Sequence, residues 1–301
     1  MTQDSFADLP GGQRICYRED GPADGVPLVL IAGLGLDLTS WPQRMIDGFT
    51  ERGFRVLRFD NRDAGCSGRI KAPNPGKLSQ LLARPLPGAY DLGDMAADTV
   101  GLLDHLDVGS AHLVGMSMGG MIAQTVAARH PERVTTLTSI FSTTGDRKVG
   151  QPARSTLLRM AKGPARTVEQ SVRRHLSLMG HLGSAAYPLD KDVETAWATS
   201  LWERAGGMRA RSGIARQIGA IQASGDRTAE VRRITCPTLV VHGDTDRMVH
   251  RSGGRATADA VRGARFVEIP GMGHHIAPDL VDRLVELTTD LAALDATGES
   301  R

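Results

Sequence analysis

Ser117 is the clearest candidate for a chemically reactive side chain in this sequence. It lies in a Gly-x-Ser-x-Gly pattern, preceded by a short apolar run at 111–114 and followed by residues 118–130, whose apolar side chains recur at helical spacing. A strand, a tight turn flanked by glycines and a helix form a nucleophile elbow, in which a strained turn exposes the serine hydroxyl at the edge of the sheet. The pattern therefore predicts that Ser117 is a catalytic nucleophile.

A serine hydroxyl needs a base to take its proton, and a loop near the C-terminus offers one. Residues 265–269 are typical of a strand, and the glycine-rich loop 271–273 leads from it to His274 and His275. A histidine on a mobile loop after the last strand can swing over the elbow. We predict that His274, directly after the glycine, is the general base. His275 is the alternative, because neighbouring side chains point in different directions.

The imidazole of such a base needs a carboxylate that fixes its tautomer. The apolar run 236–242 predicts a strand, and two aspartates follow it in a loop, Asp244 and Asp246. Asp244 directly follows a glycine and can serve the turn alone. We favour Asp246, because the apolar residues after it can pack the loop onto the core. The resulting order along the chain is serine, aspartate and histidine.

These residues sit in segments that resemble an α/β-hydrolase-fold serine hydrolase over nearly the full length of the chain. The matching segments are the elbow, the Gly-x-x-Asp-x-x-Val loop at 243–249, the Gly-x-Gly-His loop at 271–274 and a strand and loop at 28–35. Within that superfamily, residues 60–67, the Gly-Met-Ser-Met-Gly-Gly elbow and residues 269–274 most resemble the aclacinomycin methylesterase-like group of esterases.

The resemblance also implies where the oxyanion of a tetrahedral intermediate would be stabilised. One donor is the backbone amide of Met118, and the other is the amide of Leu34. Many relatives carry His-Gly in the second loop, whereas this chain has Ala32 and Gly33. The residues that we expect to contact substrate are Gly33, Met116, Met248 and Trp197. Core packing remains the simpler role for each methionine taken singly.

The elements that must position these residues alternate along the chain. We expect strands near 14–18, 28–31, 55–59, 113–115 and 134–140, and helices near 40–51, 95–106, 118–130 and 278–294. This alternation predicts an α/β fold with a mainly parallel sheet covered by helices. Residues 71–90 contain four prolines and predict an irregular loop. From about 144 to 232 the strand pattern stops, so we expect a helical cap inserted between core segments 1–143 and 233–301.

The composition of the chain gives general limits on its partners and its location. The chain has 301 residues, with 36 basic and 34 acidic side chains, so no global field favours nucleic acid or an anionic membrane. Three widely spaced cysteines argue against a disulfide framework or a zinc site. The first residues lack a charged and apolar leader, and no apolar run is long enough to span a bilayer. We expect a cytoplasmic monomer or homodimer that needs no metal or cofactor.

The functional hypothesis is a serine-dependent carboxylic ester hydrolase of the carboxylesterase type (EC 3.1.1) that works through an acyl-enzyme. The resemblance implies an apolar substrate, such as a methyl ester or lactone. One alternative keeps the same three residues but cleaves a carbon–carbon bond of a diketone-like compound. Another is a ligand-binding protein or a non-hydrolytic cyclase of the same fold.

Overall fold

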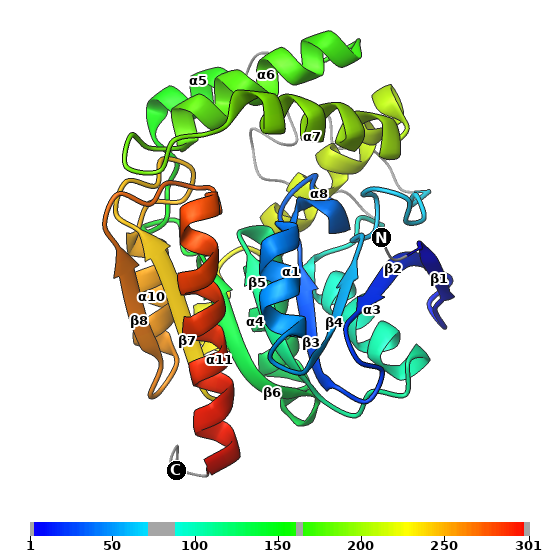
Figure 1. Ribbon diagram of the computed structural model, residues 1–301, viewed down its shortest axis with the longest axis vertical. Coiled ribbons are helices and arrows are strands. Elements are labelled where there is room, and N and C mark those ends of the chain that lie inside the picture. The colour runs from blue at the N-terminus through cyan, green and yellow to red at the C-terminus, as the bar shows by residue number, and fades with distance from the viewer. Residues whose placement is uncertain (1–2, 72–87, 161–164, 298–301) are drawn as a thin grey trace.

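The computed structural model describes residues 3–71, 88–160 and 165–297 and is built around one eight-stranded sheet (Figure 1). The strands are β1 (Ser5–Asp8), β2 (Arg14–Asp20), β3 (Val26–Ile31), β4 (Phe54–Phe59), β5 (Ala111–Met116), β6 (Val134–Ile140), β7 (Thr238–Gly243) and β8 (Arg265–Ile269). They lie in the order β1-β2-β4-β3-β5-β6-β7-β8. β2 pairs antiparallel with β1 and β4, and the remaining neighbours are parallel. The predicted α/β fold with a mainly parallel sheet is confirmed.

Helices cover both faces of the sheet. The helices of the core are α1 (Gln43–Thr50), α3 (Leu92–His105), α4 (Met118–Arg129), α10 (Ser252–Ala260) and α11 (Val281–Thr297). One hydrophobic cluster joins the sheet to α3 and α4, and a second joins it to α1 and α11. Figure 1 shows α1 and α11 in front of the sheet, with α3, α4 and α10 behind it. The central strands, after which the candidate site residues lie, are therefore covered by helices on both faces of the sheet.

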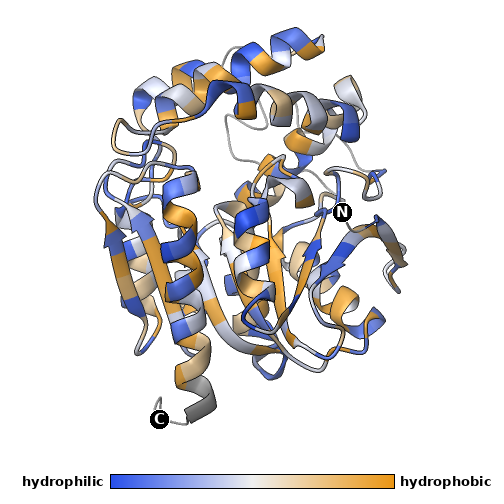
Figure 2. Cartoon of the chain, viewed as in Figure 1, coloured by the Kyte–Doolittle hydropathy of each residue, from blue (hydrophilic) through white to orange (hydrophobic). Residues whose placement is uncertain are grey.

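The central strands are buried because their sequences are almost continuously apolar. Leu28, Val29, Leu30 and Ile31 in β3 are each at most 1% exposed, as is typical of a parallel strand covered on both faces. Figure 2 shows hydrophobic residues along these strands and hydrophilic ones on the outer faces of the covering helices. Helix α3 begins with a capping box between Asp91 and Asp94, which satisfies backbone amides of its first turn.

Between β6 and β7, the described residues form helices joined by loops, with no strand. These are α5 (Arg154–Met160), α6 (Val168–Leu182), α7 (Lys191–Arg204), α8 (Ala210–Ser224) and α9 (Thr228–Val231), with the short 3₁₀ turn η3 (Gly207–Arg209). In Figure 1, α5, α6 and α7 lie above the carboxyl ends of the parallel strands, while α8 descends toward the sheet and contacts α3. The helices therefore stand over the edge at which the elbow lies. Nowhere in 3–71, 88–160 or 165–297 is there a helix long and apolar enough to cross a membrane.

Two elements differ from the expectation. Strand β1, which extends the sheet edge by antiparallel pairing with β2, and helix α10, between β7 and β8, were not among the predicted elements. The short β1 has one buried residue, Ala7, and α10 is rich in glycine and alanine, so neither shows a strong apolar period. The proposed loop 71–90 lies mostly outside the described residues.

Candidate active site

Ser117 occupies a strained turn between β5 and α4. Its backbone has φ 55° and ψ −120°, a region that residues with a Cβ rarely adopt. A Cβ on Gly115 would lie 2.3 Å from the carbonyl oxygen of Gly119, and one on Gly119 would lie 1.9 Å from that of Ile31. Only glycine fits at these two positions. The turn is further held by the hydroxyl of Ser142, which donates to the carbonyl oxygen of Ser117 at 2.8 Å.

The structure brings the three predicted catalytic side chains together from three loops. His274 Nε2 lies 3.0 Å from Ser117 Oγ, and His274 Nδ1 lies 2.7 Å from Asp246 Oδ2. A carboxylate can only accept a hydrogen bond, so Nδ1 carries the proton and Nε2 is free to accept one from the serine. This arrangement can deprotonate a serine hydroxyl during nucleophilic attack.

The two alternative residues have other partners. The Asp244 carboxylate accepts a hydrogen bond from the backbone amide of Gly271 at 2.7 Å, so it ties together the ends of two loops. His275 Nε2 points instead to Glu194 of α7, at 3.3 Å. The geometry therefore favours Asp246 and His274 over these neighbours.

Asp246 is held as a carboxylate by its surroundings. Burial alone would raise its pKa, but the charge and hydrogen bonds of His274 and His242 hold the pKa well below its ordinary value. The other carboxylate oxygen accepts hydrogen bonds from the backbone amides of Met248 and Val249, at 2.7 and 2.9 Å. These bonds fix the orientation of the carboxylate toward the imidazole.

The two predicted oxyanion donors belong to two segments that border Ser117. Met118 is the first residue of α4, and Leu34 lies in the loop after β3. A Cβ on Gly33 would lie 3.4 Å from Ser117 Cβ, so this loop passes beside the serine. Neither the Leu34 amide nor the Met118 amide donates to another of the described residues. Within the described residues, these two amides therefore have no hydrogen-bond acceptor, as the prediction requires.

The predicted substrate contacts have different positions. Met116 is 4% exposed and packs in the hydrophobic cluster beneath α1 and α11, which favours core packing. Met248 is half-buried and lies two residues after Asp246. Trp197 lies on α7 with its ring 5.0 Å from that of His175. Gly33 packs beside Ser117, whereas the side chain of Met116 is directed into the core.

Two residues that contact the predicted catalytic side chains were not among the candidates drawn from the sequence. Phe141, directly after β6, packs its ring 4.5 Å from the ring of His274 and has φ 37°. His242, at the end of β7, has Nε2 3.5 Å from Asp246 Oδ2 and donates to the carbonyl oxygen of Val249. Both lie at the carboxyl ends of parallel strands, and that position was the signal available in the sequence.

Glu194 joins the loop that carries His274 and His275 to the helices above it. Its carboxylate lies 3.3 Å from His275 Nε2 and 2.5 Å from Nε2 of His175 on α6. Burial opposes ionisation, but hydrogen bonds from His175 and His275 lower the pKa of Glu194 to about 2. The main chain adds a second link, because the His274 amide donates to the carbonyl oxygen of Leu182.

We expect Glu194→Gln to lower the free energy of unfolding by roughly 1–3 kcal/mol at pH 6. The pKa of Glu194 is depressed on folding, so its contribution is present above its ordinary pKa of 4.5 and is lost as the pH falls toward 2. The difference from the unchanged protein should therefore shrink at pH 3. Urea unfolding at both values measures it. Glu203→Gln, at an exposed position of the same helix, is the control, and equal effects of the two changes would contradict the prediction.

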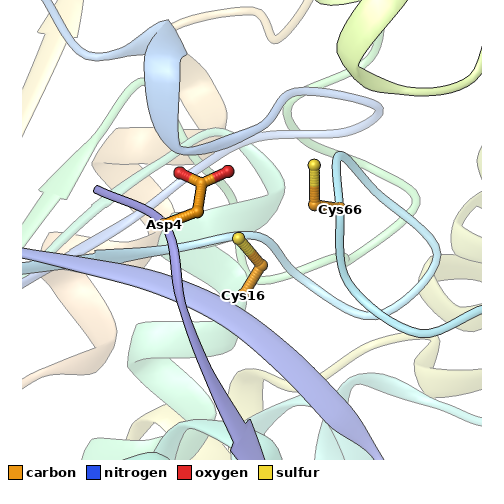
Figure 3. A group of neighbouring side chains, drawn as sticks. All are labelled: Asp4, Cys16 and Cys66. Carbon is orange, nitrogen blue, oxygen red and sulfur yellow. The ribbon is translucent and has the colours of Figure 1, made fainter. Parts of the chain in front are cut away.

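One group of side chains has the ligand types of a metal site. Asp4, Cys16 and Cys66 place ligand atoms within 4.8 Å of one another (Figure 3). However, the Arg204 guanidinium donates to Asp4 at 2.9 Å and to Cys16 Sγ at 3.2 Å, so a fixed positive charge already faces these atoms. Burial also raises the pKa of both thiols, which disfavours the thiolate that binds metals. The group is better described as part of an ion-pair network around Arg204.

Comparison with known proteins decides the family. Residues 26–279 match the alpha/beta hydrolase fold family. This chain belongs to that family. The hydrolase is 32% identical over 272 residues to the rhodomycin D methylesterase DnrP of Streptomyces peucetius, which covers 84% of this chain and 86% of that protein. The crystal structure of the enol-lactonase from Burkholderia xenovorans LB400 superposes with a TM-score of 0.75 at 26% identity, covering 96% and 100% of the two chains.

A shorter similarity links this hydrolase to an enzyme with a different kind of substrate. It is 37% identical over 134 residues to the 2-hydroxy-6-oxononadienedioate/2-hydroxy-6-oxononatrienedioate hydrolase of Burkholderia vietnamiensis, which covers 44% of this chain and 41% of that protein. The expected resemblance to methylesterases of this fold is confirmed by the longer match.

Proposed function

We propose that this hydrolase cleaves carboxylic esters through an acyl-enzyme formed on Ser117. The observation that carries the proposal is the continuous chain of contacts from Ser117 Oγ through His274 to Asp246. In this order the carboxylate fixes the tautomer that leaves the proximal imidazole nitrogen free. The strained backbone of Ser117 points its hydroxyl at that nitrogen.

In the proposed mechanism, Ser117, His274 and the two backbone amides each have a defined role. Ser117 Oγ forms a bond to the ester carbonyl carbon while His274 Nε2 takes the hydroxyl proton. The amides of Leu34 and Met118 donate to the oxygen that becomes negative. When the carbon–oxygen bond breaks, His274 returns the proton to the departing alcohol. Water then repeats the sequence on the acyl-enzyme, releasing the acid and restoring Ser117.

The relatives support the substrate class. One is a methylesterase and another an enol-lactonase, and both names describe cleavage of an acyl–oxygen bond. We therefore propose an apolar methyl ester or lactone as substrate, with Gly33, Met248 and Trp197 among its contacts. We also propose that residues 144–232 act as a cap, because helices of this segment lie over the carboxyl ends of the strands in Figure 1.

Hydrolysis of a carbon–carbon bond is the second candidate. The partial match to the Burkholderia vietnamiensis hydrolase favours it, because that enzyme acts on a dienedioate with a 2-hydroxy-6-oxo pattern. The shorter coverage of that match makes it the weaker candidate. Turnover on matched panels of methyl esters, lactones and vinylogous diketones distinguishes the two.

The first test is intact-mass spectrometry after incubation with a fluorophosphonate. We expect one adduct on the unchanged protein and none on Ser117→Ala. Ser142→Ala, which removes a nearby hydroxyl that donates to the Ser117 carbonyl, should still be labelled. If the folded, unchanged protein takes no label and cleaves no member of the ester panel, the esterase proposal is wrong and the ligand-binding or cyclase alternative takes its place.

A further inference from the structure

Gln217 connects a helix above the sheet to the loop that carries the predicted oxyanion donor Leu34. It lies in α8, and its side chain is completely buried. Its Oε1 accepts a hydrogen bond from the Gly35 amide at 2.9 Å, and its Nε2 donates to the carbonyl oxygen of Arg62 at 2.9 Å. Both ends of the side-chain amide are therefore engaged with core loops.

Helix α8 is itself fixed against the core. The guanidinium of Arg216 forms a buried two-point ion pair with Asp63, with Nε 2.8 Å from Oδ2. A Cβ on Gly213 would lie 2.2 Å from the carbonyl oxygen of Asp63, so the helix backbone approaches this loop too closely for any other residue. Gln217 thus projects from a rigid support, which limits where its amide can lie.

Three polar side chains hold the loop after β3 along its length. Asn61 Nδ2 donates to the carbonyl oxygen of Ala32 at 3.0 Å, near the start of the loop. Asp60 Oδ1 accepts from the amide of Leu38 at 2.8 Å, near its end. Gln217 holds the middle at Gly35, whose positive φ of 69° marks the point where the chain turns. Of the three contacts, only this one comes from the segment between β6 and β7.

The held amide is adjacent to the predicted donor. The Gly35 N–H belongs to the peptide unit directly after Leu34, so fixing that unit restricts rotation of the Leu34 backbone. An oxyanion donor is effective when it already points to where the charge develops, because it then needs no reorganisation during the reaction. Ile214, one turn before Gln217 on α8, also packs against Gly35, since a Cβ there would lie 3.0 Å from its Cγ1.

We propose that Gln217 is a positioning residue that holds the oxyanion loop in its active conformation. The assignment rests on the proposed esterase function for its kinetic consequence, whereas its structural consequence can be measured separately. It also means that α8 acts as part of the catalytic framework rather than as a freely moving part of the cap.

The kinetic test uses Gln217→Met, which keeps the side-chain length but removes both hydrogen bonds. We expect kcat for an activated ester to fall about tenfold to a hundredfold, with KM changed less than about threefold. The affinity for a boronic acid, whose adduct with Ser117 is tetrahedral, should fall by a similar factor. Gln217→Glu keeps an acceptor for the Gly35 amide and should retain more kcat than Gln217→Met, even where it unfolds more easily.

Gln124→Met is the matched control. Gln124 is also completely buried, and its amide bonds to Ser139 and Arg227, which lie in other parts of the core. This variant should lose thermal stability comparably to Gln217→Met but keep kcat and boronic acid affinity within about threefold of the unchanged protein. Equal kinetic losses in the two variants would show that Gln217 contributes only to packing and would overturn the proposal.

Amide hydrogen exchange, followed by mass spectrometry, tests the loop without any substrate. Gln217→Met should raise exchange in peptides covering 32–38, and Gln124→Met should not. Unchanged exchange in these peptides would overturn the positioning role. Faster exchange in a protein that neither hydrolyses esters nor takes the fluorophosphonate would keep the role of Gln217 in the loop and reject only the esterase function. If Gln217→Met does not fold, Gln217→Leu, which also removes both hydrogen bonds, provides the same comparison.

Discussion

Replacing Asp246 by asparagine is expected to lower kcat by about 10⁴-fold. Asp246 Oδ2 lies 2.7 Å from His274 Nδ1, and the other carboxylate oxygen is fixed by two backbone amides. An asparagine must keep its oxygen on those amides, because the opposite orientation would set an NH₂ group against two N–H donors. Its NH₂ group then faces His274 and favours the tautomer whose proton lies on Nε2. That tautomer cannot accept the proton of Ser117.

The control for this prediction is Asp244→Asn. Asp244 accepts one hydrogen bond from the amide of Gly271 and is exposed, so an asparagine oxygen can replace it. We expect kcat to stay within about threefold of the unchanged value. Steady-state kinetics and the rate of fluorophosphonate labelling should agree on both variants. A large loss in Asp244→Asn together with a small loss in Asp246→Asn would reverse the assignment of the acid.

The largest expected effect on stability comes from Arg204→Met, which should lower the free energy of unfolding by about 3–5 kcal/mol. Arg204, the last residue of α7, lies 2.6 Å from Asp60, 3.2 Å from Asp37 and 2.9 Å from Asp4. The side chains of Asp37 and Asp60 are completely buried. Methionine fills a similar volume but leaves these carboxylates without their counter-ion.

The loss should depend on pH with a definite sign. Burial raises the pKa of Asp60 to about 6 even with Arg204 present, and removing the guanidinium raises it further. A carboxyl group whose pKa is raised on folding favours the folded state at low pH and loses this contribution as the pH rises through the raised value. Arg204→Met should therefore cost more stability at pH 8 than at pH 5.

Urea unfolding at these two pH values measures the effect of Arg204→Met. Arg44→Met is the control, because Arg44 pairs with Asp282 on the surface, where both side chains are more than half exposed. Its removal should change the free energy of unfolding by less than about 1 kcal/mol. If Arg204→Met proves no more costly than Arg44→Met, the buried carboxylates are stabilised by other means.

The sequence alone was enough to predict those strands, helices and turns that depend mainly on residues close together in the chain. The apolar run of β3 requires a buried strand, and the glycines at 115 and 119 allow the turn that exposes Ser117. The regular alternation of such elements was enough for the α/β fold, and the comparisons confirm it. Periodicity failed for β1 and α10, which are short or poor in large apolar residues.

Only the tertiary structure decided which side chains meet. The sequence offered Asp244 beside Asp246 and His275 beside His274, and the catalytic roles of the preferred pair remain predictions for the experiments above. The packing of the loops gave the rivals other partners, namely Gly271 and Glu194. The difference between neighbours in a loop depends on backbone rotation, which no local pattern specifies.

The residues that hold the loop after β3 in place, Gln217 and Arg204, could not be predicted from the sequence. Gln217 is separated from Gly35 by 182 positions, and Arg204 from Asp60 by 144. In the sequence each is an ordinary polar residue of a helical segment, and such side chains are mostly exposed in folded proteins. They become partners of the loop after β3, at Gly35 and Asp37, because the helices between β6 and β7 fold over the carboxyl ends of the strands. Local sequence thus specified the turn that carries Ser117, the predicted nucleophile, whereas long-range packing determined what holds the surrounding groups in place.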